Sequence, residues 1–181
     1  MFIFFPLQLI AFVTFPGVIV HEMAHRFFCD LIGIPVYEAE YFLIGEKKAG
    51  YIRHATTSNV GHQFLISIGP LIINTLLCAL LTFPFMIVNS VELATQSPYS
   101  LVALIAMAWL GFSIGMHAFP SNQDLNVLKI VYKNNVPKSM MLRFIITIVV
   151  SFVRSVNIVP FFFLEPIYAY LISNILPMIM A

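Results

Sequence analysis

An HExxH motif at positions 21–25 lies inside an apolar stretch, directly after twenty residues, Met1–Val20, that carry no charged side chain. Ionisable residues inside a membrane-spanning segment are costly and usually serve a function. Three ionisable residues within five positions are therefore hard to explain as packing alone. The sequence predicts a functional site that is set in a membrane.

The rest of the chain is also poor in charge. Of its 181 residues, 60% are hydrophobic and only 9% are charged, whereas a soluble domain carries about 25% charged residues. We therefore expect most of the surface to face the lipid bilayer. The net charge of +1 gives no sign of nucleic-acid binding. Cys29 and Cys78 lie far apart without a CxxC pattern, which predicts small buried residues rather than a disulfide or zinc pair.

The apolar residues gather in five segments, each close to the roughly 20 residues that a membrane span needs. These segments cover about 2–31, 60–88, 99–118, 139–156 and 160–180. Pro16-Gly17 predicts a kink in the first segment. Pro166 and Pro177 leave open an alternative of four spans plus an irregular C-terminal segment. The expected fold is an α-helical polytopic membrane protein with one domain, residues 1–181, which has a core at 2–130 and C-terminal spans at 137–181.

Two connections between the spans carry most of the charge. Residues 33–57 predict a β-hairpin with strands at 36–44 and 50–52 and a turn at 45–48, and residues 124–133 predict a short interfacial helix. Eight of the nine Lys and Arg residues lie in or beside these two connections, and Arg154 is the exception. The positive-inside rule places both connections in the cytoplasm and the N-terminus outside. We expect an integral protein of a prokaryotic cell membrane whose site opens toward the cytoplasm.

The HExxH motif has a direct chemical interpretation. On a helix it places His21 and His25 one turn apart on one face, which is the spacing that binds a single zinc ion. Glu22, between them, can act as general base on a water that the metal activates. A catalytic zinc site usually has three protein ligands. The motif therefore predicts a third ligand on the same side of the membrane.

Asp124 is the best candidate for that third ligand. It follows the third apolar segment, and Pro120 can end the helix and fold the loop back toward the metal. Asp30 is disfavoured because a helix directs it about 140° away from His25. The alternative role of Asp124 is to cap the short helix that follows. His117, at the end of the same segment, is an alternative ligand or a residue that supports one.

Further motifs follow in order along the chain. Four, eight and eleven positions after the HExxH stand a small residue, a glycine and a valine, which are Cys29, Gly33 and Val36. A Gly-Pro-x-x-x-Asn pattern follows at Gly69-Pro70 to Asn74. A proline loop with an aspartate then covers Ala118–Asp124. Over about Phe12–Lys129 the chain resembles the site-2 protease family of intramembrane zinc metalloproteases, as a minimal, core-only member. It departs from the family where His117 replaces an Asn and Leu125 replaces a Gly.

The resemblance implies a zinc endopeptidase that cleaves a membrane protein within or near a transmembrane segment. It suggests that Asn74 contacts the substrate backbone or the developing oxyanion. The hairpin edge, which includes Val36 and Tyr41, is expected to receive an extended substrate segment by strand addition. The expected substrate is a transmembrane helix that unwinds near the cytoplasmic face. The sequence leaves the oligomeric state open.

Two other functions use the same residues. A metal transporter or sensor would need the ligands but not Glu22, and it would show polar residues on both sides of the metal. An inactive membrane scaffold would not need an intact HExxH. The sequence therefore favours the protease over both alternatives.

Overall fold

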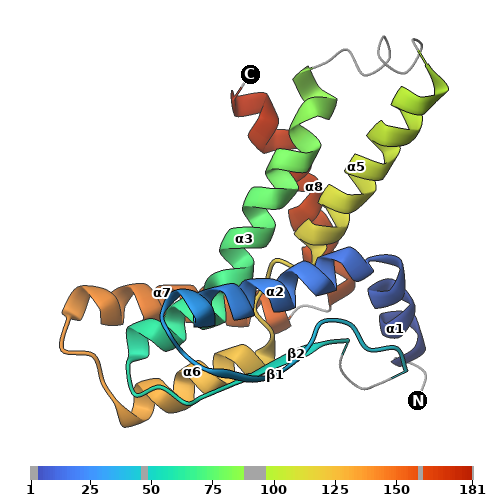
Figure 1. The fold of residues 1–181 in the computed structure, drawn as a ribbon. Helices are drawn as coiled ribbons and strands as arrows, with labels where there is room; N and C mark the ends of the chain where they lie inside the picture. Colours follow the sequence, from blue (N-terminus) through green and yellow to red (C-terminus); the bar gives the residue numbers. More distant parts are fainter. Residues whose placement is uncertain (1–3, 46–48, 88–96, 159–160, 181) are drawn as a thin grey trace.

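The computed structural model describes residues 4–45, 49–87, 97–158 and 161–180. The protein is mostly helical with one small two-stranded antiparallel sheet. Three long helices project to one side of a layer that holds the other helices and the sheet (Figure 1). The elements are α1 (Phe4–Val13), α2 (Phe15–Leu31), β1 (Val36–Glu40), β2 (Tyr51–His54), α3 (Val60–Ile87), α5 (Pro98–Met116), α6 (Asn122–Asn134), α7 (Met140–Ile158) and α8 (Phe161–Met180).

The projecting helices are α3, α5 and α8 (Figure 1). Among the residues that the structure describes, two stretches are long and apolar enough to cross a membrane, Val60–Phe83 in α3 and Tyr99–Met116 in α5. α8 packs beside both and runs as one helix from Phe161 to Met180. The alternative of an irregular C-terminal segment therefore does not apply to these residues.

The first apolar segment is divided rather than kinked. The break falls at Thr14, between α1 and α2, and not at Pro16-Gly17. Pro16 lies in the first turn of α2, where its missing N–H removes no helical hydrogen bond. Gly17 has a different purpose, because a Cβ atom there would lie 2.0 Å from the carbonyl oxygen of Ser113. The glycine lets α2 cross α5 in direct backbone contact.

The predicted antiparallel β-hairpin is confirmed. β1 and β2 pair antiparallel with Glu40 opposite Tyr51, and an irregularity falls between Val36 and Glu38. β1 begins at Val36 as predicted but ends four residues earlier, β2 covers 51–54 instead of 50–52, and residues 46–48 of the turn lie outside the described residues. Gly45 enters the turn with a φ of +81°, a conformation that favours glycine.

Below the projecting helices, α6 and α7 pack against the first turns of α3. Their contact is a buried apolar cluster of Val60, Phe64, Leu128 and Ile146. The predicted short helix at 124–133 is confirmed as α6. Cys29 and Cys78 are both free and fully buried, as expected. This packing fixes the loop between α5 and α6 beside α2.

Candidate metal centre

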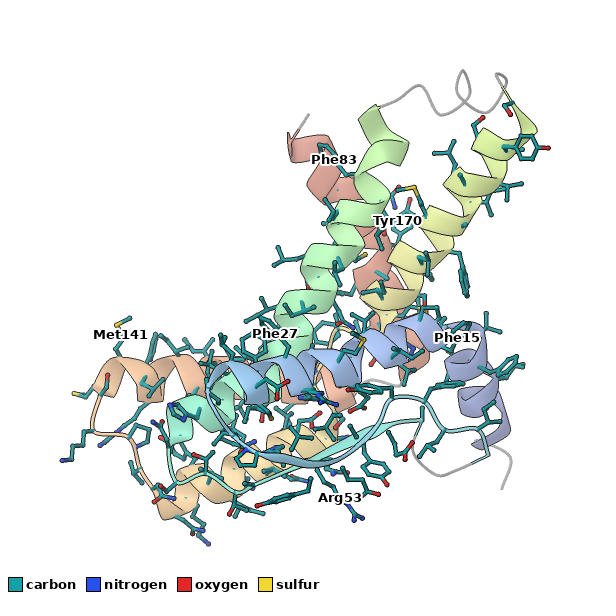
Figure 2. All side chains as sticks on the ribbon, in the orientation of Figure 1. Phe15, Phe27, Arg53, Phe83, Met141 and Tyr170 are labelled. Carbon is teal, nitrogen blue, oxygen red and sulfur yellow. The ribbon has the colours of Figure 1, made fainter. Side chains whose placement is uncertain are left out.

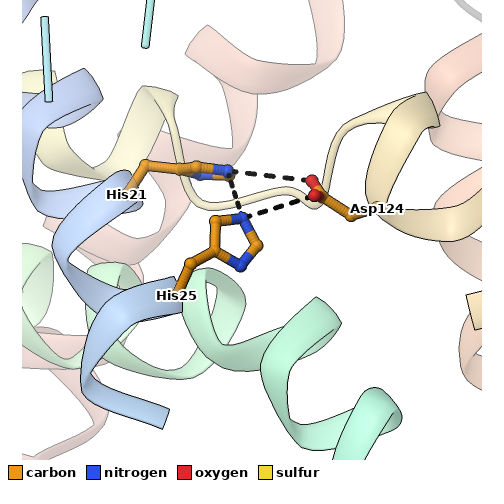
Figure 3. A group of neighbouring side chains, drawn as sticks. All are labelled: His21, His25 and Asp124. Atoms are coloured by element: carbon orange, nitrogen blue, oxygen red, sulfur yellow. Dashed lines mark hydrogen bonds and ion pairs between the residues drawn. The ribbon is translucent and has the colours of Figure 1, made fainter. Parts of the chain in front are cut away.

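Three metal-donor side chains from two distant parts of the chain converge beneath α2. His21 and His25 share one face of that helix, and Asp124 reaches them from the first turn of α6 (Figure 3). The two Nε2 atoms lie 3.2 Å apart. The Asp124 carboxylate oxygens lie 3.5 Å from His25 Nε2 and 4.0 Å from His21 Nε2. The structure therefore brings together the three residues predicted to bind metal.

Backbone carbonyl groups fix the orientation of both imidazoles. His21 Nδ1 lies 2.7 Å from the carbonyl oxygen of His117, and His25 Nδ1 lies 2.8 Å from that of Ile66. A carbonyl oxygen only accepts, so each Nδ1 carries the proton and donates it. When an imidazole is neutral, its Nε2 keeps a lone pair on the side that faces Asp124, and when His25 is protonated its Nε2 faces the carboxylate as a donor. A carbonyl partner on the far nitrogen is the usual arrangement for a metal-binding histidine.

The N-terminus of α6 holds Asp124 in place. Its Oδ2 accepts hydrogen bonds from the backbone N of Ser121 at 2.8 Å and from Ser121 Oγ at 2.6 Å. Ser121 is the N-cap residue, and the two residues form a capping box. Asp124 is thus the N3 residue of the capping box rather than the N-cap itself, and the same carboxylate also faces the imidazoles.

The charge state of Asp124 suits a cation. Burial alone would raise the pKa of this carboxyl group, but the neighbouring His25 and His21 hold its pKa well below the usual range. Two imidazole lone pairs and a carboxylate are all acceptors, and three acceptors so close together repel one another unless a proton or a cation lies among them. A tetrahedral zinc with Zn–N distances of about 2.0–2.1 Å separates its donor atoms by ~3.3 Å. The observed separations fit a metal ion bound by these three side chains.

Glu22 lies on the side of α2 that faces the hairpin. A Cβ atom at Gly50 would come within 2.8 Å of Glu22 Cγ and within 3.0 Å of the carbonyl oxygens of Glu40 and Tyr41. Gly50 therefore gives the hairpin room to approach the carboxylate-bearing side chain. The predicted general base and the predicted substrate-binding hairpin are neighbours.

His117 contributes its backbone rather than its ring. Its carbonyl oxygen accepts from His21, while its Nε2 lies 2.8 Å from Thr14 Oγ1. The Thr14 hydroxyl donates to the carbonyl of Ile10, so His117 Nε2 donates to Thr14. Among the described residues, the group of metal donors contains no ring atom of His117. The backbone carbonyl of His117 thus orients His21, a candidate metal donor, and the predicted role of the His117 ring as a ligand stays a prediction.

Asn74 is fully buried behind His117. Its Nδ2 donates to the carbonyl oxygens of Ile114 and His117, at 3.2 and 2.9 Å, and its buried Oδ1 has no hydrogen-bond partner among the described residues. The structure therefore places Asn74 as a brace between α3 and the end of α5. Its predicted contact with substrate stays a prediction.

The two hairpin residues differ in their surroundings. Val36 packs against the buried cluster of Phe28, Cys29 and Ile66, so its side chain faces the protein interior. Tyr41 follows β1, and its hydroxyl accepts a hydrogen bond from Arg26 at 2.9 Å. Both side chains are half-buried.

Sequence reasoning missed three features that hold the site together: the Ile66 carbonyl, the clearance at Gly50 and the hydroxyl of Ser121. Only Ser121 had a sequence signal, because Ser-x-x-Asp before an apolar run is typical of a capping box. Comparisons with protein-family models, with curated proteins and with solved structures give no match. The function is therefore argued from the site itself.

Proposed function

We propose that this protein is an intramembrane zinc metalloprotease of the site-2 protease type. The observation that carries the proposal is the convergence of His21, His25 and Asp124 with both Nδ1 atoms engaged by carbonyl groups. The glutamate that completes the HExxH motif adds a general base next to the donors. A site that only transports or senses metal does not require that glutamate.

Each residue of the centre has a distinct task. A zinc ion held by His21, His25 and Asp124 would supply Lewis acidity, which polarises the scissile carbonyl and makes water more acidic. Glu22 takes the proton from the attacking water and delivers it to the leaving amine. The carbonyls of Ile66 and His117 keep the imidazoles oriented while the proton moves.

The proposed substrate is a membrane protein that presents an extended segment, because a helix engages its own amide groups. The hairpin is the natural place for that segment, since an added strand would lie beside Tyr41 and pass close to Glu22. The close approach of Gly50 to Glu22 supports this placement. A transmembrane helix that unwinds near the membrane surface meets the requirement.

The proposed location is an integral position in a prokaryotic cell membrane, with the hairpin and the site opening on the cytoplasmic side. The apolar stretches of α3 and α5 support membrane insertion. The distribution of Lys and Arg supports the orientation. α8, packed along both helices, is proposed as a third crossing.

A comparison of wild type with Glu22→Gln tests the function. Each protein is reconstituted in liposomes with zinc and a synthetic transmembrane peptide whose helix is interrupted by Gly-Pro near one end, and new peptide ends are detected by mass spectrometry. We expect cleavage by wild type, a loss of roughly 10²–10⁴-fold in the variant, and about one zinc in both.

Two outcomes would contradict the proposal. Equal cleavage by both proteins would assign the activity to a contaminant. Zinc binding without cleavage of any interrupted transmembrane peptide would favour the transporter or sensor.

A further inference from the structure

α3 and α8 run in the same direction. Thr75 Oγ1 lies 2.5 Å from Tyr168 Oη, and further along both helices Cys78 Sγ lies 3.5 Å from Ser173 Oγ. Figure 1 shows both helices rising from the layer that holds α2. Two parallel helices that cross a membrane begin on the same side. α8 therefore begins where α3 begins.

α5 runs the opposite way and ends on that same side. Gly115 packs against Cys78, and Gly111, one turn earlier in α5, packs against Thr82. The segment between the end of α5 and the start of α8 thus leaves and re-enters the membrane on one side. It must cross the bilayer an even number of times. In the described part of this segment lie only α6 and α7, so α7 cannot be a single crossing.

The surface of α7 has three distinct sides. One side packs on the protein through buried or half-buried apolar residues: Leu142, Ile146, Val149, Val150 and Val153. A second side is an exposed apolar row at helical spacing: Met141, Ile145, Ile148 and Phe152. A third side is exposed and polar: Arg143, Thr147, Ser151 and Arg154. A polar side next to an exposed apolar side is typical of a helix that lies in a membrane surface.

We propose that α7 lies along the cytoplasmic interface of the bilayer instead of crossing it. Its exposed apolar row enters the acyl region, and Arg143 and Arg154 reach lipid phosphates. In Figure 2, α7 runs across the direction of α3, and Met141 lies on the side toward which the long helices project. The proposal rests on the membrane insertion of α3, α5 and α8, and it is independent of proteolysis.

This placement also accounts for the one exception in the charge distribution. With a crossing at 139–156, Arg154 would be the single basic residue on the outer side. With α7 in the interface, all nine Lys and Arg residues lie in or beside the cytoplasmic part. The positive-inside rule is then obeyed without exception.

Tryptophan depth measurements test the placement. Trp109 is the single tryptophan of the chain, so Trp109→Phe gives a background for one new tryptophan at Met141, Ile145, Ile148 or Phe152. Vesicles of phosphatidylcholine and phosphatidylglycerol carry quenchers at several acyl depths. We expect one shallow depth for all four positions. A crossing helix would instead separate Met141 and Phe152 by ~16 Å, and such a gradient would overturn the proposal.

The control for depth resolution is α5. Native Trp109 and a tryptophan at Val102, in the Trp109→Phe background, lie seven residues apart and should differ in depth by ~10 Å. If the α7 positions were not quenched at any depth, a protein partner would cover the row and the proposal would fail. Because the depth measurement needs neither zinc nor cleavage, its result is independent of the protease assay.

The location of the C-terminus gives a second test. With the hairpin in the cytoplasm, crossings by α3, α5 and α8 alone after the hairpin place residue 181 outside, whereas an additional crossing by α7 places it inside. Alkaline phosphatase fused after residue 181, which is active only outside the bacterial cytoplasm, should be active. An inactive fusion that is made in normal amounts would overturn the proposal.

Discussion

His21 donates its Nδ1 proton to the backbone carbonyl of His117, which lies 2.7 Å away. The same carbonyl oxygen accepts a second hydrogen bond from Asn74 Nδ2, at 2.9 Å. One backbone oxygen at the end of α5 thus joins a metal-donor histidine on α2 to a buried amide on α3. The orientation of His21 depends on the contact of three helices.

Replacing Asn74 with Leu keeps the branching and the number of side-chain heavy atoms but removes the hydrogen bond to His117. We expect zinc affinity to fall by roughly 10–100-fold, as for other supports of metal-binding histidines. Zinc titration with a competing chelator measures the change. Thr75→Val, one residue along α3, removes the contact with Tyr168 and should leave the affinity unchanged. Normal affinity with lost cleavage in Asn74→Leu would instead indicate the substrate contact predicted from the sequence.

Replacing Asp124 with Ala should abolish stoichiometric zinc binding, since the carboxylate is the donor on α6 that faces both imidazoles. Elemental analysis of the purified protein would show about one zinc in wild type and close to none in the variant. Asp30→Asn is the matched control, because Asp30 is exposed and pairs with Arg26 at 3.6 Å. Equal loss of zinc in both variants would mean that the metal is bound elsewhere.

Replacing Gly50 with Ala should separate zinc binding from general-base catalysis, the two parts of the proposed mechanism. The added methyl group must displace the hairpin or Glu22, since it would lie 2.8 Å from Glu22 Cγ. We expect zinc content to stay normal while the cleavage rate falls by at least tenfold, because general-base catalysis depends on position. Cleavage of the interrupted peptide at the wild-type rate would show that the hairpin does not need to approach Glu22.

Replacing Gly17 with Ala should destabilise the crossing of α2 and α5. The methyl group would meet a backbone oxygen at 2.0 Å, which cannot move without separating the helices. Overpacking of this kind costs about 1–3 kcal/mol, and a lower midpoint of thermal unfolding in detergent would report it. In Gly61→Ala the methyl group would lie 3.2 Å from the Asn59 side-chain oxygen and 3.9 Å from Leu142 Cδ2, and the midpoint should change little. Equal midpoints for the two variants would contradict this account of Gly17.

The donors of the candidate centre could be predicted because their signals are local. The spacing of His21 and His25 follows from helical geometry, and Asp124 follows from the need for an acid on the same side of the membrane. The carbonyls of Ile66 and His117 could not be predicted, because every residue has a backbone oxygen. Which oxygen meets an imidazole depends on how α2 crosses α3 and α5.

The positions of the helices and strands along the chain could be predicted from the sequence, but the orientation of each helix relative to the membrane could not. The hairpin and α6 were confirmed, since turn glycines and a capping pattern mark their ends. Hydropathy alone does not tell a helix that crosses the bilayer from one that lies along it, and the apolar residues of α7 serve both a protein face and an exposed row. The break at Thr14 was missed because a proline such as Pro16 is compatible both with a helix kink and with the first turn of a helix.

The groups that complete the candidate centre follow the HExxH motif in the sequence. These groups are the carbonyls of Ile66 and His117 and the carboxylate of Asp124, so they are synthesised after the two histidines. At ~5–20 residues per second, about 5–20 s pass between the synthesis of His25 and that of Asp124. Until then the nascent chain holds an HExxH motif whose histidines lack the carboxylate and the His117 carbonyl, so the donor group is incomplete. The group of metal donors is therefore completed only after α2, the hairpin, α3 and α5 have been made, and a site that needs all three side chains can take up its metal only at that stage.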